Sequence, residues 1–229
     1  MKLYEKLLFE SITKKIDINL KSYIDSKVIP MYKNHDRAHD EKHAKEVIET
    51  SFQIAPLVKE DINPNLLYAS SALHDVGLKV SRDNHNIHSA KIIRRLKILN
   101  KWFSKSEIEI IAQAAEDHRA SLEKIPRNIY GVIVSDSDRC SGYNIERLME
   151  RTWLYRIDDL KNESDETIFN EMFKHMNFKF GKEGYAKLWL KETYKVFKKG
   201  IERTRKICSN RDLAWDLFQE MRSDGRLKR

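Results

Sequence analysis

Apolar positions along the chain recur with a period near 3.6 residues, and no segment alternates convincingly between apolar and polar positions. This periodicity predicts helices, and prolines, glycines and capping residues indicate where they end. The expected helices cover residues 3–28 (as one or two helices), 39–55, 64–77, 86–99, 104–118, 129–139, 143–157, 164–177, 183–207 and 210–222. The sequence therefore predicts an all-α fold without internal repeats.

The helix expected over 64–77 differs from the others because it has almost no polar face. Asn63 is a favourable N-cap, and Pro64 occupies the first helical position, where a missing N–H costs nothing. The apolar residues of this helix are Leu66, Leu67, Ala69, Ala72 and Leu73. A helix that is apolar on all sides is expected to be central and buried.

Composition supports one helical unit. The 229 residues include only 7 glycines and 4 prolines, which argues against sandwiches and barrels with their glycine-rich turns. Apolar residues make up 41% of the chain, enough to offset the entropy lost on folding. No Pro- or Ser-rich linker divides the chain, so we expect a single domain over 1–229.

The cysteine pattern and the net charge indicate the cellular compartment and the class of partner. Cys140 and Cys208 form no CxxC pair, and no apolar run approaches the ~18 residues that cross a bilayer. We therefore expect a cytoplasmic protein without a membrane partner. The formal net charge of +8, with basic residues crowding the C-terminal third, would attract phosphates or nucleotides. A solvated basic face explains the same clustering, so nucleic acid is a possible but not a favoured partner.

The most informative tripeptide is His74-Asp75-Val76, because two metal-capable side chains end an otherwise apolar helix. Burying a carboxylate costs several kcal/mol unless a partner compensates. A divalent metal ion would compensate, and imidazole and carboxylate suit such an ion without thiolates. The alternative is that the pair only caps the helix end, where the helix dipole favours a histidine.

Other histidines and aspartates change this balance, because each lies at or near the edge of an apolar segment. They are His43, His85, His118 and Asp136. Several helices of a bundle can direct ligands toward one interior point. Convergence of these side chains around a shared cation is the simplest interpretation of the pattern.

The ordered series His43, His74-Asp75 and Asp136 resembles the signature of the HD-domain superfamily of metal-dependent phosphohydrolases. HAKEV, SSALHDVG and SDSDR are similar to the segments around the family's ligands, and the resemblance covers about residues 35–155. It implies an HD-like helical bundle with additional C-terminal helices over about 160–229. It also implies that these four residues are metal ligands.

The choice between two aspartates and the number of metal ions are separate questions about the ligands. In SDSDR, Asp136 and Asp138 point in different directions on a helix, so only one should face the metal. The resemblance favours Asp136, with Asp138 pairing with Arg139 or a helix terminus. HNIHSAKII and EDH are similar to segments of the family's binuclear branch, which implies that His85 and His118 bind a second metal bridged by Asp75.

The resemblance implies hydrolysis of a phosphomonoester or phosphodiester, with a nucleotide as the favoured substrate, by attack of metal-bound hydroxide. Asp75 would hold the metal and orient the water, and Lys79 would contact phosphate. Further candidates for the phosphate are Arg139, Arg147 and Arg151, although a solvated surface is the favoured explanation of these arginines. One or two divalent ions are expected per chain, and Fe, Mn, Mg, Zn, Ni and Co are not distinguished. The oligomeric state is left open.

Two other functions fit the same residues. Some proteins with this fold carry a di-iron centre and are oxygenases, and His85 and His118 are compatible with such a site. A third interpretation is a non-catalytic nucleotide- or RNA-binding module that uses the basic C-terminal helices. Metal content, oxygen dependence and turnover distinguish the three.

Overall fold

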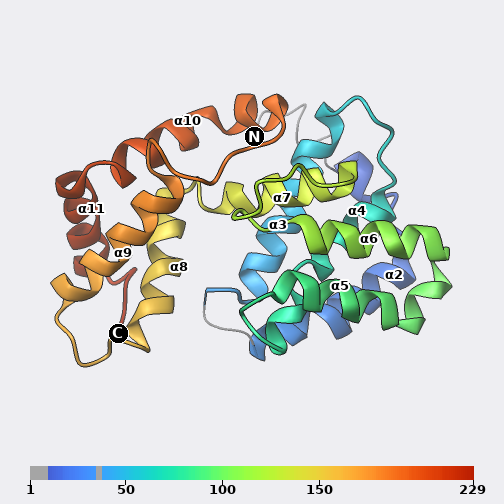
Figure 1. The fold of residues 1–229 in the computed structure, drawn as a ribbon, viewed down its shortest axis with the longest axis horizontal. Coiled ribbons are helices and arrows are strands. Elements are labelled where there is room, and N and C mark those ends of the chain that lie inside the picture. The colour runs from blue at the N-terminus through green and yellow to red at the C-terminus, as the bar shows by residue number, and fades with distance from the viewer. Residues whose placement is uncertain (1–9, 35–37) are drawn as a thin grey trace.

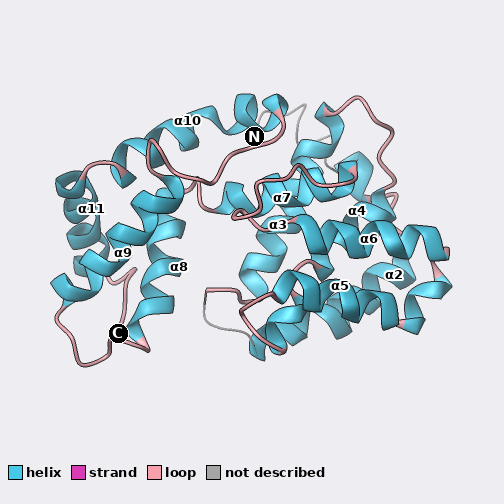
Figure 2. Cartoon of the chain, viewed as in Figure 1, coloured by secondary structure: helices cyan, strands magenta, loops and turns pink. Residues whose placement is uncertain are grey.

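The computed structural model of the protein describes residues 10–34 and 38–229, and this described part contains helices and no strands (Figure 2). The α-helices are α2 (Ile18–Tyr23), α3 (Glu41–Ile54), α4 (Pro64–Leu73), α5 (His85–Arg95), α6 (Lys105–Asp117), α7 (Ile129–Ser141), α8 (Ile145–Ile157), α9 (Asp165–Phe180), α10 (Lys191–Cys208) and α11 (Arg211–Ser223). The short helical turns are η1 (Ile24–Val28), η2 (Ile29–Asn34), η3 (Ala55–Leu57), η4 (Val76–Lys79) and η5 (Lys97–Lys101). The prediction of an all-α fold is confirmed.

Local signals place most of the helix boundaries. Asn63 accepts hydrogen bonds from the second and third residues of α4, and every residue from Leu66 to Leu73 is buried, as expected. Ser104 and Glu107 form a capping box at the start of α6. The start of α10 differs from the prediction, because residues 181–190 form a loop and the helix begins only at Lys191.

Two hydrophobic cores fill the fold. The first lies among α2 to α7 and includes Phe52, Leu67 and Ile133. The second lies among α8 to α11 and is more aromatic, with Trp153 and Phe169 at its centre. Figure 1 shows α8, α9 and α11 together at one end and α2 to α6 at the other. The second core includes α8, which the sequence grouped with the HD-like part, and the division into domains stays a prediction.

Helix α7 connects the two bundles. It packs against α3, α4 and α6 and leads directly into the turn before α8 (Figure 1). Gly142 ends α7, and a Cβ atom there would lie 2.1 Å from the Phe180 ring, so glycine allows α9 to approach closely. In the described ranges no helix has both the length and the apolar character needed to cross a membrane.

Candidate metal centre

The His74-Asp75 pair lies at a sharp change of backbone direction. Helix α4 ends at Leu73, His74 is its C-cap, and Asp75 precedes the turn η4. The buried Tyr32 hydroxyl donates to the Ala72 carbonyl at 2.9 Å and accepts from the Asp75 amide at 3.3 Å. Both His74 and Asp75 are buried, with 0% and 2% of their surface exposed. This end of α4 therefore presents its polar side chains to the protein interior.

Three other helices bring one histidine each to the same place. His43 lies in the first turn of α3, where the Asp40 side chain accepts its backbone N–H at 2.9 Å. His85 is the first residue of α5, and His118 is the C-cap of α6. The four histidines thus come from the first turns of α3 and α5 and from the C-caps of α4 and α6, so these helices meet at their ends.

The Asp75 carboxylate lies between two pairs of histidines. One oxygen, Oδ2, is 3.3 Å from Nε2 of His74 and 3.9 Å from Nε2 of His43. The other, Oδ1, is 3.2 Å from Nε2 of His118 and 3.3 Å from Nε2 of His85. Each carboxylate oxygen thus faces its own histidine pair, which is the arrangement of two adjacent metal sites bridged by one carboxylate.

Backbone carbonyls fix the tautomer of three of these histidines. Nδ1 lies 2.7 Å from the carbonyl oxygen three residues earlier in His74 and in His118, and 2.9 Å away in His85. A carbonyl only accepts, so Nδ1 must carry the proton. In the neutral ring, Nε2 then has a free lone pair directed at Asp75. Outer partners of this kind are typical of histidines that bind metal.

Several polar atoms of the cluster lack partners within the described part of the chain. Both ring nitrogens of His43, Nε2 of His74 and Oδ1 of Asp75 are buried without a hydrogen bond. Burial lowers the pKa of His43 to about 3 and that of His85 to about 4, which favours neutral rings. Burial opposes ionisation of Asp75, yet His74 and His118 hold its pKa well below the usual range. Burial opposes protonation of His74, but the Asp75 carboxylate raises its pKa. The neutral rings of His43 and His85 beside an ionised Asp75 fit a divalent cation.

Asp138 occupies the position that the sequence assigned to Asp136. Its Oδ1 is 3.2 Å from Nε2 of His43. The two oxygens of Asp136 instead accept the backbone N–H groups of Trp189 and Leu190, at 2.8 and 3.0 Å. The prediction that Asp136 faces the cluster is therefore wrong in geometry, because Asp136 instead binds the backbone of the two residues that precede α10.

The reason lies in the start of α10. A helix over 183–207 would have used the N–H groups of Trp189 and Leu190 internally, but α10 begins at Lys191 and leaves both as donors. Asp136 lies on the face of α7 toward these donors. Asp138, two residues later, is on a different face and meets α3. No signal in the sequence marks this helix start.

Among the predicted phosphate contacts, two arginines are engaged in structural roles. Arg139 is 1% exposed and donates to the Ser135 hydroxyl and to the Arg119 carbonyl. Arg147 is buried against Glu46 and Glu150, each with an N···O distance of 2.9 Å. Neither guanidinium is free to bind a substrate phosphate as predicted.

The other two predicted contacts differ from each other. Lys79 is exposed at the end of η4 and makes no hydrogen bond or ion pair with any described residue. Arg151 donates from Nε to the Ala38 carbonyl at 2.8 Å and from Nη1 to the Ser141 hydroxyl at 2.7 Å. It also lines a cavity that contains Asp138. Of the four cations predicted to meet phosphate, Arg151 alone lines this cavity beside the cluster.

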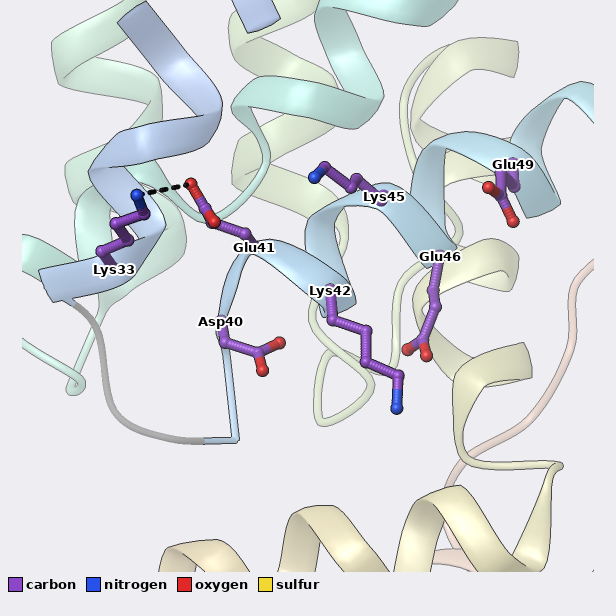
Figure 3. Close-up of a pocket in the computed structure, with 7 residues that line it drawn as sticks. All are labelled: Lys33, Asp40, Glu41, Lys42, Lys45, Glu46 and Glu49. Atoms are coloured by element: carbon purple, nitrogen blue, oxygen red, sulfur yellow. Dashed lines mark ion pairs between the residues drawn. The ribbon is translucent and has the colours of Figure 1, made fainter. Parts of the chain in front are cut away.

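Two surface hollows differ in their relation to the cluster. The one in Figure 3 lies along the outward face of α3 and is lined by charges of both signs, including a Lys33–Glu41 pair at 3.9 Å. None of the clustered residues lines it. The second hollow, of about 80 Å³, is lined in part by Asp138, whose Oδ1 is 3.2 Å from Nε2 of His43. Its cationic residues outside the sequence-based set are Arg82 and Lys179.

Comparison with known proteins agrees with the geometry. A guanosine-5'-triphosphate,3'-diphosphate pyrophosphatase from Pseudoalteromonas translucida (strain TAC 125) is 33% identical over 96 residues, which is 39% of this chain and 19% of that protein. The matched segment thus covers less than a fifth of the length of this relative. No solved structure matches significantly. The family model of the HD domain matches residues 12–143, more than half of the 229 residues, and the chain belongs to the HD domain family.

Proposed function

We propose that the protein is a metal-dependent phosphohydrolase that acts on a phosphate ester, with a nucleotide as the favoured substrate. The observation that carries the proposal is the Asp75 carboxylate, whose two oxygens each lie within 3.3 Å of a histidine Nε2 from a different pair. Family membership supports the same reaction class. The two metal positions would be held by His43, His74, Asp75 and Asp138, and by Asp75, His85 and His118.

A divalent ion bound there supplies Lewis acidity toward a phosphoryl oxygen and lowers the pKa of a water ligand. The chain's own residues prepare the site before any ligand arrives. The Nδ1 hydrogen bonds of His74, His85 and His118 hold each ring with its lone pair inward. Burial excludes bulk water from Asp75, so electrostatic interactions at its carboxylate are stronger than in solvent.

The nature of the substrate follows from two observations. The relative from Pseudoalteromonas is named for a guanosine nucleotide with terminal phosphates, which supports a nucleotide for this chain as well. The cavity at Asp138 carries cationic residues, which favours an anionic group beside the metal centre. Together they support a phosphorylated nucleoside whose phosphate reaches the cluster.

The test is hydrolysis of a panel of nucleotides, including guanosine-5'-triphosphate,3'-diphosphate, by protein loaded with a defined divalent metal. Asp75→Ala should abolish turnover and reduce the metal content. Asp216→Ala, an exposed aspartate on α11, is the matched control and should retain both. Equal turnover by wild type and Asp75→Ala would refute the proposal.

The same preparation separates the competing functions. Two irons per chain, a requirement for oxygen and no release of phosphate would identify an oxygenase. Tight nucleotide binding without turnover, weakening steeply with salt, would identify a binding module.

A further inference from the structure

The cavity of about 80 Å³ next to Asp138 is formed mainly by residues that lie outside the part of the chain matched by the family. Its far wall comes from α8 and α9, with Arg151, Tyr155 and Lys179. The near wall includes Arg82 and Asp138. Because Asp138 is also 3.2 Å from Nε2 of His43, a group seated in the cavity lies against the candidate metal centre.

Lys179 carries a half-buried ammonium without an ion-pair partner among the described residues. This ammonium also donates no hydrogen bond to a described residue, and its Nζ lies 5.1 Å from the centre of the Phe180 ring. Burial lowers its pKa to about 8; the Asp138 carboxylate acts in the opposite direction, and the nearby guanidinium groups of Arg151, Arg139 and Arg82 add to the lowering. An ammonium in such surroundings is stabilised by binding an anion.

Arg151 is held rigidly at the cavity wall. Its Nε and Nη1 hydrogen bonds to Ala38 and Ser141 use two of the five guanidinium N–H groups and leave the others for a ligand. Arg82 lies 4.3 Å from the centre of the Tyr155 ring, so this guanidinium is also positioned by packing. The cavity thus combines a free ammonium with two oriented guanidinium groups.

Charge and size define the ligand. Among the described lining residues, the cations Arg82, Arg151 and Lys179 outnumber the single carboxylate, Asp138, and this excess of positive charge favours a phosphate monoester dianion over a diester monoanion. A volume of about 80 Å³ has room for a phosphoryl group and is smaller than the ~300–1,000 Å³ of pockets that enclose a whole drug-sized ligand.

We propose that this cavity binds a terminal phosphate monoester, with Lys179 and Arg151 as specificity-determining residues supplied by the C-terminal bundle. The proposal rests on the phosphohydrolase function and narrows its substrate to molecules that end in a dianionic phosphate. The nucleoside or other organic part lies outside the cavity.

The experiment compares p-nitrophenyl phosphate, a monoester, with bis(p-nitrophenyl) phosphate, a diester, in metal-loaded protein. Wild type should prefer the monoester, and Lys179→Gln should raise its KM about tenfold or more because a charge-assisted hydrogen bond is lost. The diester KM should change little. Lys174→Gln is the matched control, because Lys174 is on the same helix and pairs with Glu171 at the surface. Binding of inorganic phosphate, measured by calorimetry, should weaken in Lys179→Gln in parallel.

The outcomes separate the two proposals. Metal-dependent hydrolysis with a diester preference, or with the same monoester KM in Lys179→Gln and wild type, overturns the cavity assignment and leaves the phosphohydrolase function standing. Phosphate binding that depends on Lys179 in a protein that hydrolyses neither these esters nor the nucleotide panel overturns the phosphohydrolase function and supports the anion site. Absence of phosphate binding and of hydrolysis of all these substrates overturns both.

Discussion

Exchanging Asp136 or Asp138 for asparagine tests the assignment of the two carboxylates of α7. Asp136 accepts one backbone N–H on each oxygen, at 2.8 and 3.0 Å. Asparagine keeps a single acceptor oxygen, so one N–H would face an amide NH₂ instead. A hydrogen bond to a charged group contributes ~1.5–3 kcal/mol, so Asp136→Asn should lower the free energy of unfolding by about 2 kcal/mol. For a chain of this size that corresponds to a Tm lower by about 4–8 °C.

Asp138→Asn should have a different effect. Asp138 accepts no helix-capping hydrogen bond, and its carboxylate lies beside His43. Removing the charge takes one donor from the first metal position. Replacing even the outer partners of metal ligands costs about 10–100-fold in affinity, so loss of a direct ligand should weaken metal binding by about tenfold or more.

The assay combines thermal melts of the metal-free proteins with titration against a chelating indicator dye. We expect Asp136→Asn to melt early and keep its metal affinity, and Asp138→Asn to melt near wild type and bind metal weakly. The reverse pattern, with weakened metal binding in Asp136→Asn alone, would refute the structural assignment and favour the one made from the sequence.

Three further perturbations test the packing, the metal and the phosphate cavity. Gly77→Ala places a Cβ 2.1 Å from the His85 carbonyl oxygen and 2.3 Å from the Ser89 amide nitrogen. The free energy of unfolding, measured by thermal melts, should fall by about 1–3 kcal/mol, and mass spectrometry should find less metal per chain. An unchanged Tm would contradict the close contact. A divalent ion at about 100 times its Kd should stabilise the metal-free protein by ~2.7 kcal/mol, or about 5–11 °C in Tm, and Asp75→Ala should lack this gain. Because Lys179, with a pKa of about 8, is a cation below that pH and neutral above it, the monoester KM should rise as pH passes 8, and Lys179→Arg should flatten that rise.

The sequence predicts the fold and most of the cluster because the relevant signals are local. Asn63 and Pro64 start α4 where expected, and the apolar sequence that follows makes this helix central. Polar side chains at the end of a helix that is buried on all sides need binding partners in the interior. For this reason the sequence alone indicates His74 and Asp75 as a candidate site. His43 is indicated by a different local signal, because it lies four residues before the apolar Val47 and therefore shares the buried face of α3.

What the sequence does not predict depends on contacts between distant segments. The loop over 181–190 folds back on α9, with the Ala186 amide donating to the Lys179 carbonyl at 3.0 Å. Gly184 permits this because a Cβ there would lie 2.5 Å from the same carbonyl oxygen. Periodicity alone extends α10 through this loop. The backbone donors of Trp189 and Leu190 that bind Asp136 are therefore not predicted, and the resemblance alone assigned Asp136 to the cluster in place of Asp138.

The position of α7 explains why the cavity forms where it does. Two residues apart on this helix, Asp136 binds the start of α10 and Asp138 meets His43, so one helix fixes both the C-terminal bundle and the metal cluster. Any shift of the C-terminal bundle transmitted through Asp136 would therefore move Asp138 as well. Lys179 reaches the cavity from that bundle. The bundle that supplies the proposed phosphate-binding cations is thus anchored on the helix that carries a candidate metal ligand.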